Sequence, residues 1–97
     1  MNLIISTAVR VKLANKIPPV TENEITQCFA NRTHNFLLDT RAQHLTNPIT
    51  RWFIAETDFG RKLKVVFMPK KEGIEIKSAF DPIAEELRIY AKKSLPI

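Results

Sequence analysis

Hydrophobic and polar positions change their spacing twice along the chain. Before residue 35 the apolar side chains recur every three or four positions, which is the period of one helix face. From residue 35 to residue 80 they alternate with polar side chains, which is the period of a strand, and the helical spacing returns after Asp81. The pattern therefore predicts helices, then a sheet, then a last helix.

The first predicted helix covers residues 6–16. Ser6 or Thr7 can cap it, because either hydroxyl can accept a hydrogen bond from a free backbone N–H of the first turn. Alternation in the same stretch leaves a strand open as the second interpretation. The helical interpretation rests on one apolar stripe: Ile5, Val9 and Leu13.

A second helix is expected to begin at Thr21. Glu24 follows three residues later, so that the two side chains can each bond the other's backbone N–H in a capping box. An apolar stripe continues the helix: Ile25, Cys28 and Phe29.

Four strands are expected between these helices and the last one. Turn residues bound them at 57–60 and 69–73, and residues 40–50 form a polar loop. The strands are predicted at residues 36–38, 51–57, 62–68 and 73–80. Consecutive strands joined by short turns predict an antiparallel meander.

The last helix is expected after Asp81 as its N-cap, with Pro82 in the first helical position, where no N–H is lost. Its apolar stripe comprises Ile83, Leu87, Tyr90 and Ala91. The fold class is therefore predicted as α+β: two N-terminal helices, a four-stranded antiparallel sheet and a C-terminal helix, in one domain over residues 1–97 with the helices on one sheet face.

The alternation also assigns the two faces of the predicted sheet. The face under the helices is expected to carry Leu63, Val65, Phe67, Ile74 and Ile76. The opposite face is then expected to carry Lys62, Lys64 and Lys77.

The net charge of +5 and an isoelectric point of about 9.7 favour an anionic partner such as RNA. Residues 61–71 contain five basic residues and no acidic residue. These five are predicted to contact a nucleic-acid backbone: Arg61, Lys62, Lys64, Lys70 and Lys71. The alternative is that these lysines keep the strand soluble and protect the sheet edge.

Other site types have little support in the sequence. Cys28 is the single cysteine, which excludes an intrachain disulfide, and its place on the helix stripe predicts a core residue. His34 and His44 lie ten residues apart without a metal-binding motif, so no metal and no cofactor are predicted. No apolar run approaches the ~20 residues of a membrane span. The cytoplasm is the expected location, without membrane contact.

Scission of RNA suits the side chains that remain. It needs a base for the 2′-hydroxyl, cations for the charged phosphorane and an acid for the leaving oxygen. The predicted catalytic residues are Arg51, Lys77, Arg88 and Tyr90. For Tyr90 the alternative is a place in the apolar stripe of the last helix, and for Arg88 a solvated helix face.

An ordered series of motifs runs from about Ala14 to Tyr90. It comprises Val20-Thr21-Glu22-Asn23-Glu24 with Phe29, then Asp39, Arg41 and His44, then Arg51, Gly60-Arg61-Lys62-Leu63-Lys64-Val65-Val66-Phe67, Ile76-Lys77-Ser78-Ala79, and Glu86, Arg88 and Tyr90. This series resembles the BrnT-like toxins of bacterial type II toxin–antitoxin systems. The resemblance implies a RelE-like ribonuclease fold, RNA as the substrate and an antitoxin-like protein as a partner.

Two departures from that family pattern concern polar chemistry. Ile17-Pro18-Pro19 replaces the family's Lys-His-Gly, and Phe80 stands where the family has Arg. Two interpretations of the protein therefore stay open: it is a metal-independent ribonuclease, or it is a relative that has lost the catalytic activity. The alternative function is a non-catalytic RNA- or protein-binding module that uses the basic sheet face.

The chain also resembles short proteins labelled ADP-ribosyl-dinitrogen-reductase hydrolase. Hydrolases of that class are larger helical proteins with clustered aspartates around Mg²⁺, and this sequence has no comparable cluster. That function is the least favoured of the three.

Overall fold

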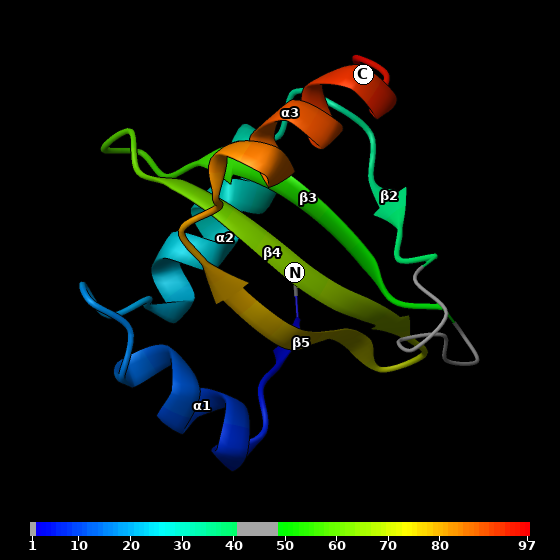
Figure 1. Cartoon of the computed structure of the whole chain (residues 1–97). Helices are drawn as coiled ribbons and strands as arrows, with labels where there is room; N and C mark the ends of the chain where they lie inside the picture. Colours follow the sequence, from blue (N-terminus) through cyan, green and yellow to red (C-terminus); the bar gives the residue numbers. More distant parts are fainter. Residues whose placement is uncertain (1, 41–48) are drawn as a thin grey trace.

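The computed structural model describes residues 2–40 and 49–97 (Figure 1). In chain order its elements are β1 (Leu3–Ile4), α1 (Thr7–Ala14), α2 (Glu22–Asn31), β2 (Leu37–Leu38), β3 (Arg51–Glu56), β4 (Lys62–Lys70), β5 (Gly73–Phe80) and α3 (Ala84–Lys93). The α+β class, the two N-terminal helices and the C-terminal helix are as predicted. Most of the predicted loop, including Arg41 and His44, lies outside the described residues.

Within the described residues, the sheet has five strands in the order β1-β5-β4-β3-β2. Strands β2 to β5 form the predicted antiparallel meander. β1 adds a parallel partner, with Leu3 opposite Ile74, so the sheet is mixed. The four predicted strands and their antiparallel pairing are therefore confirmed, and the prediction missed only β1, because a two-residue strand is too short to produce a visible alternation.

Both N-terminal helices begin where the sequence predicts. The Ser6 hydroxyl accepts a hydrogen bond from the Val9 N–H at 3.2 Å, which caps α1. Thr21 and Glu24 form the complete capping box of α2, with distances of 3.1 Å and 3.0 Å. These starts were predictable because the interacting groups lie within three residues of each other.

α2 covers one face of the sheet and fixes the main core. The Phe29 ring of α2 lies 4.7 Å from the Phe53 ring and 5.3 Å from the Phe67 ring. The Cys28 thiol donates a hydrogen bond to the Ala55 carbonyl at 3.6 Å. As the alternation predicts, this face carries Leu63, Val65, Phe67 and Ile76.

α3 covers the opposite face, so the expectation of helices on one face is wrong. Figure 1 shows α2 and α3 on opposite sides of the sheet. Tyr90 of α3 packs against Trp52 of β3, with the ring centres 5.6 Å apart. The physical reason lies in β3, which is apolar on both faces, since its inner residues are Trp52, Phe53, Ile54 and Ala55.

A β-bulge interrupts the predicted alternation in β5. Val66 of β4 lies opposite Ser78, whereas the next residue, Phe67, lies opposite Ile76. Lys77 is therefore an extra residue between two pairs. Two residues that strict alternation puts on opposite faces are consequently both fully buried: Ile76 and Ala79.

The start of α3 also differs from the prediction. Ile83 is the N-cap residue and the helix begins at Ala84, so Asp81 is not the cap and Pro82 lies before the helix. The Ile83 N–H donates instead to the Glu86 carboxylate at 3.0 Å. Asp81 is drawn away from the helix by the Arg61 guanidinium, from which it accepts hydrogen bonds of 2.7 Å and 3.0 Å.

Candidate functional site

The predicted catalytic residues on α3 lie on different sides of the helix. Tyr90 is buried, and its hydroxyl donates a hydrogen bond to the Asn35 carbonyl at 2.9 Å. Burial raises the pKa of Tyr90. Arg88 is exposed and pairs with Glu85, whose carboxylate accepts a hydrogen bond from Nε at 3.0 Å. The two residues therefore do not point to one shared reaction centre.

The predicted catalytic residues on the strands lie on opposite faces of the sheet. Arg51 is opposite Phe67 and so shares the α2 face. Lys77 lies in the bulge, with its ammonium 3.5 Å from the carboxylate of Glu75. Glu75 is opposite Met68, which lies on the other face of β4. Nothing in the described contacts joins these two strand residues to Arg88 or Tyr90.

Arg61 is held inside the protein and is not placed to receive a phosphate. Its guanidinium donates to the Pro18 and Pro19 carbonyls at 2.8 Å each. It also forms ion pairs with Asp81 at 2.7 Å and Glu24 at 3.3 Å. Only 16% of the side chain is exposed. Arg61 thus ties the loop before α2 to the segment before α3.

Lys64 is also withdrawn from solvent, because α3 covers its face of the sheet. Its ammonium lies 2.7 Å from the Glu86 carboxylate and 4.4 Å from the centre of the Trp52 ring. The side chain is 10% exposed. The predicted open face with Lys62, Lys64 and Lys77 is therefore divided: α3 covers Lys64, and the other two lysines remain accessible.

Cations remain at the end of the sheet where β4 turns into β5. Lys70 and Lys77 share the Glu75 carboxylate, at 3.0 Å and 3.5 Å. The hydrogen bond from Lys70 lowers the pKa of Glu75, and Lys77 acts in the same direction. Lys71 is exposed in the adjoining turn, beside exposed Glu72. This cationic turn, defined as Lys70, Lys71 and Lys77, keeps a net positive charge.

A cavity of about 320 Å³ lies between α3, the C-terminal end of β3 and the N-terminal end of β4. Its polar lining comprises Thr33, His34, Glu56, Lys62 and Tyr90. Glu56 and Lys62 lie directly opposite each other across the two strands. We call this space the His34 cavity. It joins Lys62 and Tyr90, which the sequence predicts as site residues, with two residues that it does not. The sequence raises His34 only as a metal ligand, and it does not single out Glu56.

The C-terminal segment holds His34 in this position. His34 forms an isolated bridge with Pro96, and the Asn35 N–H donates to the Leu95 carbonyl at 2.7 Å. The Thr33 hydroxyl lies 3.0 Å from His34 Nδ1. Within residues 2–40 and 49–97, His34 Nε2 has no hydrogen-bond partner. Nε2 is therefore the ring nitrogen of His34 that the described residues leave unoccupied, and His34 lines the cavity.

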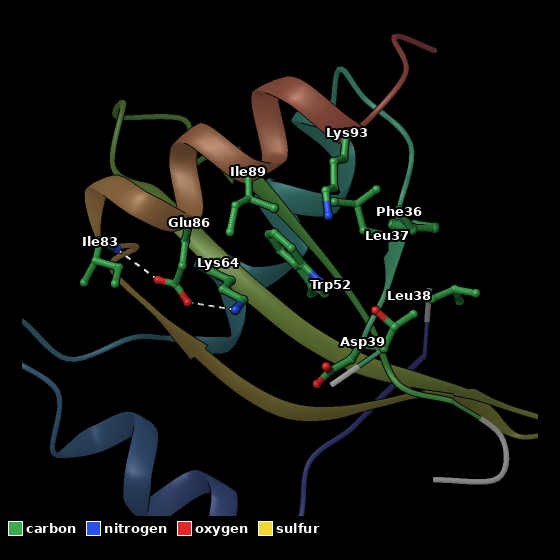
Figure 2. A pocket seen from close by; sticks show the side chains of 11 residues that line it. Phe36, Leu37, Leu38, Asp39, Trp52, Lys64, Ile83, Glu86, Ile89 and Lys93 are labelled. Carbon is green, nitrogen blue, oxygen red and sulfur yellow. Dashed lines mark hydrogen bonds and ion pairs between the residues drawn. The ribbon is translucent and has the colours of Figure 1, made fainter. Parts of the chain in front are cut away.

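A second, larger pocket of about 720 Å³ lies on the other flank of α3 (Figure 2). Its apolar wall comprises Phe36, Leu37, Leu38, Trp52, Ile83 and Ile89. Its charged side chains are Asp39, Lys64, Glu86 and Lys93. We call it the Trp52 pocket. Among the described residues, it has no lining residue in common with the His34 cavity.

Other chemistry finds little support in the described part of the chain. There, no group of three or more His, Cys, Asp or Glu side chains is arranged to hold a metal ion. Cys28 is fully buried, and burial raises its pKa to about 12. No described helix is both long enough and apolar enough to cross a membrane.

No protein-family model, curated protein or solved structure matches the chain. The resemblance to BrnT-like toxins therefore rests on the sequence motifs alone. Two of those motif residues, Arg41 and His44, lie outside the described residues. The same motif also includes Asp39, which is buried and lines the Trp52 pocket.

Proposed function

We propose that the protein is a metal-independent endoribonuclease related to the BrnT-like toxins, and that RNA is cleaved at the His34 cavity. The single observation that supports this is the meeting of an imidazole, an ammonium group and a carboxylate in one cavity: His34, Lys62 and Glu56. A histidine with an available ring nitrogen is the commonest general base in proteins. The net charge of +5 favours the approach of RNA.

In the proposed reaction His34 Nε2 accepts the proton of a 2′-hydroxyl. The 2′-oxygen attacks the adjacent phosphorus, and the bond from phosphorus to the 5′-oxygen breaks. The products are a 2′,3′-cyclic phosphate and a free 5′-hydroxyl, whose proton comes from water. Lys62 stabilises the negative charge that develops on the phosphorane oxygens. Glu56 lies directly opposite Lys62 on the neighbouring strand and adds a carboxylate to the same cavity.

Tyr90 has a positioning role in this proposal. Its hydroxyl is bonded to the Asn35 carbonyl, next to His34 in the chain, and its ring lies 6.0 Å from the His34 ring in an edge-on arrangement. The ring therefore supports the orientation of the imidazole. Arg51, Lys77 and Arg88 have no assigned part in the reaction at this cavity.

The test uses a DNA oligonucleotide with a single ribonucleotide and the same oligonucleotide made wholly of DNA. We expect the protein to cleave only the first, at the ribonucleotide, and to leave a cyclic phosphate. His34→Gln should lower the cleavage rate by about 10²-fold or more, and Lys62→Gln by a smaller factor. Lys92→Gln, an exposed lysine that lines neither cavity, is the matched control. Cleavage that survives His34→Gln would exclude this site.

An antitoxin-like protein partner belongs to the same proposal through the family resemblance. Expression of the chain in bacteria should then arrest growth, and His34→Gln should relieve the arrest. Growth arrest that is equal for both chains would separate toxicity from the His34 cavity.

The second candidate is a non-catalytic RNA-binding module. The specific observation in its favour is the cationic turn, where three lysines face two carboxylates, Glu72 and Glu75. RNA held there should dissociate as salt increases, with a slope in log–log form of about −0.7 per neutralised phosphate. Lys71→Gln should reduce that slope by about 0.7, and Lys12→Gln on α1 should leave it unchanged. Binding without cleavage of any RNA would favour this candidate over the first.

A further inference from the structure

The Trp52 pocket has the dimensions and walls of a small-molecule site, independently of the proposed ribonuclease. Its volume of about 720 Å³ falls within the ~300–1,000 Å³ that is typical of ligand pockets. Apolar side chains from three separate parts of the fold form the walls, including Leu37 of β2, Trp52 of β3 and Ile89 of α3. Figure 2 shows these side chains around one concave space.

The charged groups of this pocket are not equally engaged. The carboxylate of Glu86 accepts from both Lys64 at 2.7 Å and the Ile83 N–H at 3.0 Å. Asp39 is buried and also takes part in a polar interaction. Lys93, by contrast, has no ion-pair partner among the residues that the structure describes. Lys93 is therefore the cation of this pocket that has no ion pair with a described residue.

Lys93 is also well placed to reach a ligand. It lies in the last turn of α3, and Figure 2 shows its side chain extending from the helix toward Trp52. A negative group that pairs with Lys93 would therefore lie next to the apolar wall of the pocket. The pocket thus offers one cation at its rim and an aromatic surface at its floor.

We propose that the Trp52 pocket binds a small organic anion with an aromatic or branched apolar body. The anionic group pairs with Lys93, and the apolar body lies against Trp52, Leu37 and Ile89. The ion pair between Lys64 and Glu86 forms the polar part of the floor and stays intact, because each of its charges already has its partner. Burial of the apolar body supplies most of the affinity, and Lys93 supplies the preference for an anion.

A matched pair of fluorescent probes tests this proposal. The dye 8-anilinonaphthalene-1-sulfonate carries a sulfonate on an aromatic body, and N-phenyl-1-naphthylamine has the same aromatic body without the charge. We expect the sulfonate dye to bind with one-to-one stoichiometry and to quench the emission of Trp52, which is the single tryptophan. The uncharged dye should bind about three- to fivefold more weakly, as expected for the loss of one partly exposed ion pair.

Neighbouring lysines on α3 provide matched variants. Lys93→Gln should weaken binding of the sulfonate dye about three- to fivefold and leave the uncharged dye unaffected. Lys92→Gln should leave both affinities unchanged, because Lys92 does not line the pocket. Circular dichroism of each variant confirms that the fold is intact.

Three results would overturn the proposal. The first is no saturable binding of the sulfonate dye. The second is equal affinity for the two dyes, which would assign the pocket to neutral apolar ligands. The third is equal effects of Lys93→Gln and Lys92→Gln, which would indicate non-specific attraction to a basic helix. Loss of RNA cleavage in His34→Gln has no bearing on these outcomes, because the two sites share none of the described residues.

Discussion

The ammonium group of Lys64 lies between the carboxylate of Glu86, at 2.7 Å, and the ring of Trp52, whose centre is 4.4 Å away. The lysine belongs to β4 and the glutamate to α3, so the pair joins the helix to the sheet. Both side chains are largely withdrawn from water, with exposed fractions of 10% and 19%. Each charge therefore depends on the other to offset its loss of hydration.

Removal of one charge from this pair should destabilise the protein more than removal of both. We expect Lys64→Met or Glu86→Gln alone to lower the free energy of unfolding by about 2–3 kcal/mol, because each leaves a poorly solvated charge behind. The double variant should recover part of that loss, since it leaves no poorly solvated charge without a partner. Urea denaturation of the four proteins gives the coupling energy. Strictly additive losses would show that the two charges do not depend on each other.

Arg61 should contribute to stability and not to RNA binding. Lysine cannot replace its planar set of donors to Pro18, Pro19 and the two carboxylates. We therefore expect Arg61→Lys to lower the free energy of unfolding by about 2 kcal/mol. The neighbouring exposed lysine provides the control, because Lys62→Gln should change stability by no more than about 0.5 kcal/mol. An unchanged unfolding midpoint for Arg61→Lys, together with a weaker affinity for RNA, would reverse this assignment.

Local interactions explain the parts of the fold that the sequence predicts well. The capping box of Thr21 and Glu24 needs only residues three apart, and the alternation at the start of β4 can be recognised within that strand alone. β1 was missed because two residues show no period, and its pairing with β5 joins opposite ends of the chain. Asp81 has the usual character of an N-cap, but Arg61 from a distant turn engages it.

The candidate sites were less predictable, because charge in a sequence does not reveal its partners. Arg61 and Lys64 have the character of surface cations in the sequence, yet Asp81 and Glu86 neutralise them inside the fold. His34 lies in loop-like sequence, and in the fold it lines its cavity and forms a bridge with Pro96 near the other end of the chain. No spacing rule connects these two positions, so the His34 cavity could be found only in three dimensions.

Gly73 allows the close approach of β1 to β5. A Cβ atom at this position would lie 2.4 Å from the Asn2 carbonyl oxygen, which itself accepts a hydrogen bond from the Ile74 N–H at 2.9 Å. Gly73→Ala should therefore displace β1 and lower the free energy of unfolding by about 2–3 kcal/mol. Amide hydrogen exchange should show the loss of protection at Ile74.

The other glycine provides the control for this substitution. Gly60 has a φ of 86°, but a Cβ there meets nothing within 4 Å. We expect Gly60→Ala to lower the free energy of unfolding by about 1 kcal/mol through backbone strain alone. Equal costs at the two positions, with Ile74 still protected, would show that contact with Asn2 is not limiting.

Burial of Cys28 should make stability fall at alkaline pH. Its pKa is raised from 9.0 to about 12, with burial as the main cause and the nearby charge of Glu24 as the next. The folded state therefore keeps a proton that the unfolded state releases above pH 9. The contribution of the thiol is fully present below pH 9 and is lost progressively between pH 9 and about 12.

Cys28→Ala isolates this effect from the other groups that titrate at high pH. The variant should be less stable than the wild type at pH 8, because it loses buried volume and the hydrogen bond to the Ala55 carbonyl. The difference in unfolding free energy should shrink by about 1 kcal/mol between pH 8 and pH 10, since only the wild type has a thiol to ionise on unfolding. Guanidinium denaturation at the two pH values measures it, and labelling with a thiol reagent should require unfolding. A constant difference, or rapid labelling of the folded protein, would mean that Cys28 reaches solvent.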